Sequence, residues 1–298
     1  MKEMKEIIMP SENQVIHFEL FRYQLLPLTR NVQREMFQDE RFLAINTVEE
    51  LKARKNEIFG HVLEDFPSLQ YRQAEINHKV DVESPPWFVV EINTQKSLKR
   101  EKPDFKQERI DTWPHVIAII NNKPDVQIIA VSRNIRAFSS GAVVAKILQE
   151  NLGRILQRYL LSFQVDALFE KSEFWHLVEE YKNRIISVNF ELISPNMANI
   201  SKGLELDLAR LNADTNSHRT DLRLNSLEGS ALEINQRNPL LNSLVDYSSE
   251  GGGDIALKIK GVRKIIRTST SVREISIDEL STQNLTPERL EWLFEQFK

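Results

Sequence analysis

The stretch VIAIINNKPDVQIIAVSR, residues 116–133, restricts the possible folds of this chain more than any other segment. Two nearly uninterrupted apolar runs, rich in β-branched residues, flank the polar segment Asn121–Asp125. This pattern predicts a β-hairpin with a loop of about five residues. Successive strand residues point to opposite faces, so strands that are apolar at every position need cover on both faces. We therefore expect this hairpin in the middle of a sheet.

Strand and helix patterns follow one another irregularly along the rest of the chain. Thr47 with Glu50 three residues later is typical of a capping box, which predicts a helix over 46–65. Proline at a first helical position predicts helices from Pro239 and Pro287. Further helices are expected at 142–160, 172–184 and 200–211, and further strands at 15–27, 69–82, 85–95, 184–195, 220–230, 231–234, 254–261 and 271–277. The order favours an α+β fold with mixed sheets, hairpins and packed helices. We divide it into an N-terminal subdomain, residues 1–160, and a C-terminal subdomain, residues 161–298.

Composition excludes several classes of protein. The net charge of −4 excludes a wholly basic nucleic-acid-binding protein but permits a local basic face. Without cysteine the chain has no disulfide and no thiolate metal site. The first residues lack the apolar core of a signal peptide, and no apolar run approaches the roughly 18 residues of a membrane helix. We therefore expect a cytoplasmic protein that does not insert into a membrane.

Three consecutive glycines, Gly251, Gly252 and Gly253, could suggest a phosphate-binding loop. Such a loop places a lysine and a hydroxyl residue after its glycines and opens a helix. Here Asp254 and a predicted strand follow, and a predicted helix precedes. This order is typical of a helix C-cap. Because three glycines exceed the need of one cap, we predict a flexible hinge at 251–253.

Basic residues gather in three segments. In DIALKIKG, Ile255, Leu257 and Ile259 alternate with lysines, so one strand face is expected to pack while the other stays basic. A second cluster lies in TQKSLKREKPDFK, expected to be a loop, and a third precedes the helix at 142–160, whose N-terminus could accept phosphate. The residues predicted to contact nucleic-acid phosphates are Lys258, Lys260, Arg263, Lys264 and Arg267, with Lys96, Lys99, Arg100, Arg133 and Arg136 extending the track. The alternative interpretation of each cluster is a solvated edge that lysines protect from aggregation.

No catalytic residue, metal ligand or cofactor can be assigned from the sequence. His176 could share a helix face with Glu179 or Glu180, but a metal site needs a third ligand. Whether the protein is an enzyme stays open, with a non-enzymatic binding protein favoured. The alternatives are a metal-dependent nuclease whose carboxylates meet only in the folded chain, and an interaction subunit that recognises a phage or host protein.

The order of segments over residues 85–275 resembles that of a group of bacterial phage-defence and abortive-infection proteins. The resemblance is carried by RIISVNFELISPN, a helix, TDLRLN, a second helix, the glycine break and DIALKIKG. The group includes the A protein of the phage lambda Rex exclusion system and the B subunit of the Kiwa defence system. The resemblance implies an antiviral protein that binds DNA, or RNA, without strong sequence specificity. It also implies a homodimer or larger oligomer and a second defence-system subunit as a partner, and it transfers no catalytic residue.

Overall fold

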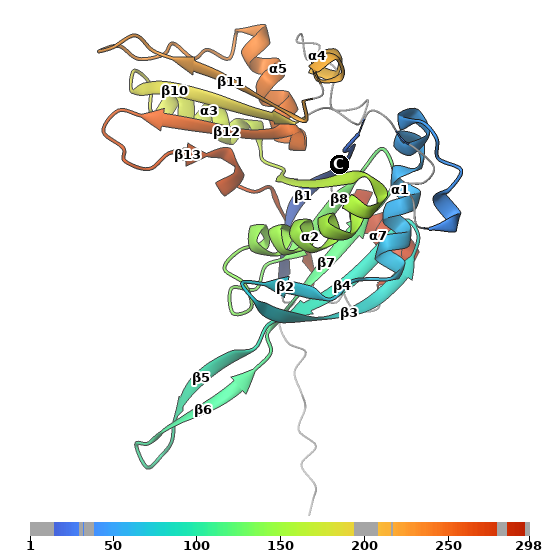
Figure 1. Ribbon diagram of the computed structural model, residues 1–298. Helices are drawn as coiled ribbons and strands as arrows, with labels where there is room; N and C mark the ends of the chain where they lie inside the picture. Colours follow the sequence, from blue (N-terminus) through green and yellow to red (C-terminus); the bar gives the residue numbers. More distant parts are fainter. Residues whose placement is uncertain are drawn as a thin grey trace, which may run out of the picture.

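The first strand of the chain lies inside the larger of two main sheets. The computed structural model describes residues 15–29, 32, 39–193, 208–215, 217–278 and 285–295. Strand order in the larger sheet is β14-β1-β8-β7-β4-β3-β2, and β9 also pairs with β1 (Figure 1). The strands are β1 (Val15–Pro27), β2 (Leu69–Tyr71), β3 (Ala74–Ser84), β4 (Trp87–Asn93), β7 (His115–Asn121), β8 (Ile128–Ser132), β9 (Leu161–Ala167) and β14 (Glu274–Asp278). Together with the helices below, these strands confirm the α+β class.

The predicted apolar hairpin is confirmed as β7 and β8 in the middle of this sheet. Ala118 pairs with Val131 and Ile120 with Ile129, and these side chains are buried beneath α1 (Val48–Glu64) and α2 (Gly141–Leu156). Ile119 and other residues of the opposite face pack against α7 (Pro287–Glu295). Both faces are therefore covered, which is why the two strands are apolar at successive positions.

The smaller sheet has the order β11-β10-β12-β13. Its strands are β10 (Ile185–Ile193), β11 (Arg219–Asn225), β12 (Gly253–Ile259) and β13 (Ile266–Arg267). α3 (Lys171–Glu180) and α5 (Pro239–Tyr247) pack on one face, where Phe174 and Leu244 meet Phe190. α4 (Leu208–Thr215) is drawn at the top of the view, to the right of α5 (Figure 1). The opposite face of the smaller sheet is polar and includes Glu191 and Asp254.

The two sheets are joined by two chain crossings, one after β9 and one before β14. The crossings are hydrogen-bonded, with the Arg273 N–H donating to the Leu168 carbonyl at 2.6 Å and the Leu168 N–H to the Leu20 carbonyl at 3.0 Å. β9, β14 and α7 thus belong with the larger sheet. The second subdomain lies between Leu168 and Arg273, rather than beginning at residue 161 and running to the end of the chain.

Local predictions were confirmed at the N-termini of α1 and α5 and wrong at several strands and at one helix C-terminus. Thr47 and Glu50 form the expected capping box, and Asn238 caps α5. The predicted strand 69–82 is two strands, because Arg72 and Gln73 take positive φ angles of 48° and 68° and make a turn. The helix from residue 142 ends at Leu156 instead of 160, and it is followed by β9, a strand that was not predicted. The strand predicted at 231–234 does not form. Most of the helix predicted at 200–211 lies outside the described residues.

The segment predicted as a lysine-rich loop is instead a separate two-stranded sheet, β5 (Lys96–Glu101) and β6 (Gln107–Thr112). No helix within the described ranges is both long and apolar enough to cross a membrane.

Candidate functional site

Strands β5 and β6 form an arm, residues 96–112, that projects from the larger sheet (Figure 1). Lys96 pairs with Thr112 at its base, and Glu101 pairs with Gln107 near its tip. Every residue of β5 is exposed. Because no other element covers the arm, its stability comes from its own ladder and cross-strand pairs. Such a ribbon offers both faces to a partner.

The charges of the arm are unevenly compensated. Lys102 pairs with Glu108 at 3.4 Å, and Lys106 with Asp104 at 3.7 Å. Lys99 lies directly opposite Arg109 in the ladder, a like-charged pair that destabilises the ribbon by itself. Within the arm, which is described throughout, the ion pairs are made by Lys102 and Lys106 and not by Lys96, Lys99, Arg100 or Arg109. A bound anion between Lys99 and Arg109 would relieve their repulsion.

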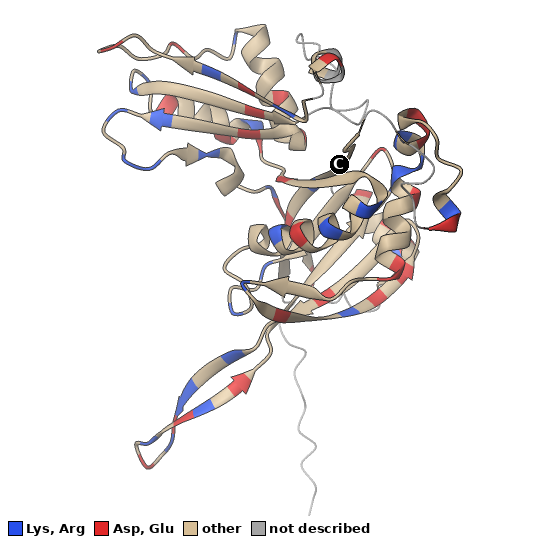
Figure 2. Ribbon diagram, viewed as in Figure 1, with Lys and Arg blue, Asp and Glu red and all other residues tan. Residues whose placement is uncertain are grey.

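The basic cluster after the glycines lies at the other end of the molecule from the arm (Figure 2). Ile255, Leu257 and Ile259 are buried as expected, and Lys258 and Lys260 are exposed. Arg263 and Lys264 are exposed in the turn between β12 and β13. The predicted residues therefore form two separate basic surfaces instead of one track.

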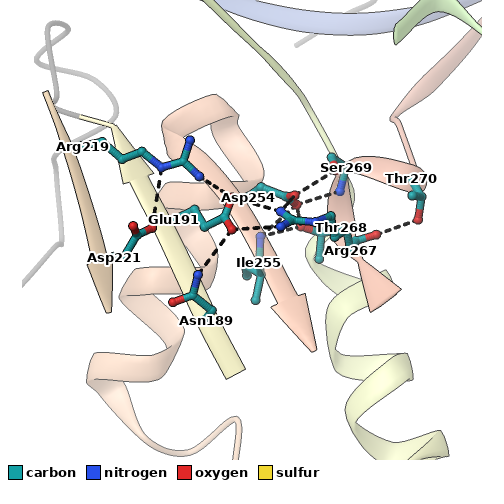
Figure 3. Close-up of polar contacts among 10 residues, drawn as sticks. All are labelled: Asn189, Glu191, Arg219, Asp221, Asp254, Ile255, Arg267, Thr268, Ser269 and Thr270. Atoms are coloured by element: carbon teal, nitrogen blue, oxygen red, sulfur yellow. Dashed lines mark hydrogen bonds and ion pairs between the residues drawn. The ribbon is translucent and has the colours of Figure 1, made fainter. Parts of the chain in front are cut away.

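Arg267 does not belong to either basic surface, contrary to the prediction. Its guanidinium donates to Glu191 Oε2 at 2.9 Å and Oε1 at 3.0 Å, and to Asp254 Oδ2 at 2.9 Å (Figure 3). Glu191 and Asp254 are directly opposite one another in the ladder between β10 and β12. Arg267 separates two carboxylates that would otherwise repel, so it stabilises the sheet. These hydrogen bonds lower the pKa of Glu191 and raise that of Arg267.

Replacing Arg267 by alanine is expected to destabilise the fold by about 2 kcal/mol at neutral pH, because Glu191 and Asp254 lose a shared partner. Arg219 also bonds Glu191, which limits the loss. Urea unfolding at pH 7 and pH 4 measures the effect. The difference from wild type should shrink at pH 4, because Arg267 lowers the pKa of Glu191 and this stabilisation is lost as Glu191 becomes protonated. An equal loss at both pH values contradicts this interpretation.

The predicted phosphate position at the start of α2 is already occupied by a side chain of the protein. Glu19 Oε2 accepts a hydrogen bond from the Gly141 N–H at 2.8 Å, and Glu19 is only 5% exposed. Ser140 is at the N-cap position but its side chain makes no cap bond. Arg133 is bound to Glu274 at 3.1 Å, and Arg136 is exposed nearby. The helix N-terminus is thus satisfied internally and does not support phosphate binding there.

The three glycines are buried and closely packed, so the prediction of a flexible hinge is wrong. Gly251 has a φ of 81°, in agreement with a left-handed residue near a helix end, and a Cβ there would overlap the Arg22 side chain. A Cβ at Gly252 would overlap the ring of Tyr247. A Cβ at Gly253 would come within 2.9 Å of the Glu191 carbonyl carbon. Three glycines follow one another here because neighbouring atoms approach each position too closely for a Cβ, and not because the backbone must be mobile.

A cavity of about 570 Å³ lies between the two sheets. Its polar lining includes Asp166 of β9, Glu191, Asp254, Arg219, His218 and Lys146 of α2. Burial, followed by the charges of Asp254 and Glu191, raises the pKa of Asp166 to about 7 against the lowering effect of Arg219. Among the described residues no group of three or more His, Asp or Glu side chains could hold a metal ion. The nuclease alternative gains no metal site from these residues.

Sequence reasoning missed Arg109, the exposed tip of the arm and Asp166. The arm has no hydrophobic alternation, because both of its faces are exposed. The available signal was Pro103-Asp104, a turn pair between two polar segments of similar length. Asp166 lies on β9, which was not predicted.

No protein-family model, curated protein or solved structure matches this chain. The resemblance to phage-defence proteins therefore stays a hypothesis.

Proposed function

We propose that this protein binds nucleic acid, DNA in the first place, without reading its sequence. The observation that carries the proposal is the projecting arm, where Lys99 lies opposite Arg109 and neither residue takes part in the ion pairs of the described arm. A two-stranded ribbon is narrow enough to enter the major groove of DNA. Lysine and arginine contacts to phosphates position a protein on the duplex but carry no sequence information.

The second basic surface, made of Lys258, Lys260, Arg263 and Lys264, is proposed to contact phosphates separately from the arm. Arg136 is a further exposed candidate, whereas Arg267 and Arg133 are excluded from the proposal because Glu191, Asp254 and Glu274 bind them. The resemblance in segment order supports a role in bacterial antiphage defence, inside the cytoplasm, as a homodimer. It also supports association with a second defence-system subunit.

A salt series with arm variants tests the proposal. Fluorescence anisotropy with a labelled duplex should give a log K against log salt slope of about −3.6 if four arm cations contact phosphates. In Lys99→Glu/Arg109→Glu we expect at least about 30-fold weaker binding at low salt and a slope that is shallower by about 1.8, because two phosphate contacts are lost. Single-stranded DNA and RNA in parallel identify the preferred nucleic acid.

The matched control is Lys52→Glu/Lys182→Glu, which changes the net charge equally at exposed positions away from the arm. This control should bind with a nearly unchanged slope. The proposal is wrong if wild-type protein binds none of the three nucleic acids at low salt. It is also wrong if the arm variant and the control lose affinity equally.

A further inference from the structure

Phe105 at the tip of the arm is 97% exposed. An aromatic ring of this size normally buries most of its surface, so a nearly free ring at the end of a projecting ribbon needs an explanation. The turn residues beside it are polar or charged, including Lys102, Asp104 and Lys106. The ring also belongs to none of the apolar clusters formed by the described residues.

Hydrogen bonds close the backbone turn that presents Phe105. The Phe105 N–H donates to the Lys102 carbonyl at 2.9 Å, and the Lys102 N–H donates to the Lys106 carbonyl at 2.9 Å. The Lys106 N–H also donates to Asp104 Oδ1 at 3.3 Å. Phe105 takes a left-handed φ of 61°, which is unusual for a bulky residue. The turn thus directs the ring outward at the end of the arm.

We propose that Phe105 stacks on a nucleobase when the arm binds nucleic acid, an inference that rests on the proposed function. Every base has a π-face, so stacking on an aromatic ring is tolerant of sequence and agrees with phosphate contacts by the arm. Lysines on either side of the ring would keep it close to the sugar-phosphate backbone. The base can come from a single strand, or from a duplex into which the ring inserts as a wedge.

The surroundings of Phe105 favour a base over a protein pocket. A protein hot spot places its aromatic anchor among apolar contacts that exclude water. The residues next to Phe105 are charged, and the other exposed apolar pair of the arm, Leu98 opposite Ile110, lies in the middle of the ribbon. A base needs only one ring face, with cations nearby for its phosphate.

Oligonucleotides that carry 2-aminopurine, in single-stranded and duplex form, test the inference. With wild-type protein we expect the base fluorescence to fall on single strands if Phe105 stacks there, or to rise in the duplex if the ring separates neighbouring bases. Phe105→Ala should bind about tenfold more weakly, leave the base fluorescence unchanged and retain the salt slope. Phe105→Trp should restore both the affinity and the fluorescence change. Thermal melting of the free variants should match wild type, because the ring is exposed.

The outcomes distinguish a failure of the stacking inference from a failure of the proposed function. If Phe105→Ala gives the affinity and the fluorescence change of the wild type while Lys99→Glu/Arg109→Glu binds at least about 30-fold more weakly, the stacking inference is wrong and the proposed function stands. If no nucleic acid binds wild type, both are wrong. If Phe105→Ala converts a dimer of the free protein to a monomer in sedimentation, the ring docks on a second copy and the inference is overturned.

Discussion

Alanine in place of Gly253 is expected to unfold the smaller sheet, with a loss of more than about 4 kcal/mol. Gly253 has φ 142° and ψ −164°, a region that only glycine occupies readily. It begins β12 opposite Leu192, and an added Cβ would overlap the carbonyl oxygen of Glu191. Since that oxygen belongs to the neighbouring strand, relief requires the two strands to separate. Urea unfolding followed by circular dichroism measures the loss.

Gly229→Ala is the matched control for this prediction. Gly229 also has a positive φ, 81°, but nothing lies within 4 Å of an added Cβ. The control carries the strain of a left-handed φ without the overlap, so we expect a loss of only about 1 kcal/mol. Similar losses of stability in Gly253→Ala and Gly229→Ala would contradict the prediction. They would show that backbone strain, rather than overlap with the neighbouring strand, destabilises Gly253→Ala.

Asp166→Asn is expected to remove a pH dependence of stability between about pH 4 and pH 7. In the folded protein the pKa of Asp166 is raised from 3.8 to about 7, first by burial and then by Asp254 and Glu191. Over this range the unfolded chain loses the Asp166 proton and the folded chain keeps it. Wild-type stability therefore falls as pH rises through the window and levels above it.

The size of the expected change in stability follows from the rise in the pKa of Asp166 on folding. From pH 4 to pH 8, Asp166→Asn should gain about 2–4 kcal/mol relative to wild type. Arg219, His218 and Lys146 also line the cavity, and all three residues are retained in Asp166→Asn. Asp104→Asn, which removes a carboxylate from the exposed arm, controls for net charge. Parallel pH profiles of wild type and Asp166→Asn would contradict the prediction.

The features that sequence predicted well are those whose cause is local or whose apolar pattern is unambiguous. The capping box at Thr47 and Glu50 involves neighbours on one turn, and the β7–β8 hairpin is apolar throughout. The α+β class followed from the order of such segments. Each of these depends on residues close together in the chain.

The features that sequence missed depend on contacts between distant strands. Arg267 looked like an exposed cation because its partners Glu191 and Asp254 meet only in the register of β10 and β12. Gly253 looked mobile because the carbonyl of Glu191 that limits it comes from another strand. The arm looked like a loop because a ribbon exposed on both faces needs no hydrophobic period.

The pairing of β1 with β8, β9 and β14 has a consequence for synthesis on the ribosome. Phe18 pairs with Ile275, which is translated after all strands of the smaller sheet. The smaller sheet can therefore form before β14 has been translated. During that time the part of one β1 edge that pairs with β14 has no partner strand. Among the described strands, β1 is translated first and its partner β14 last, after every strand of the smaller sheet. A stalled ribosome in that interval would leave the Phe18 edge open to other chains.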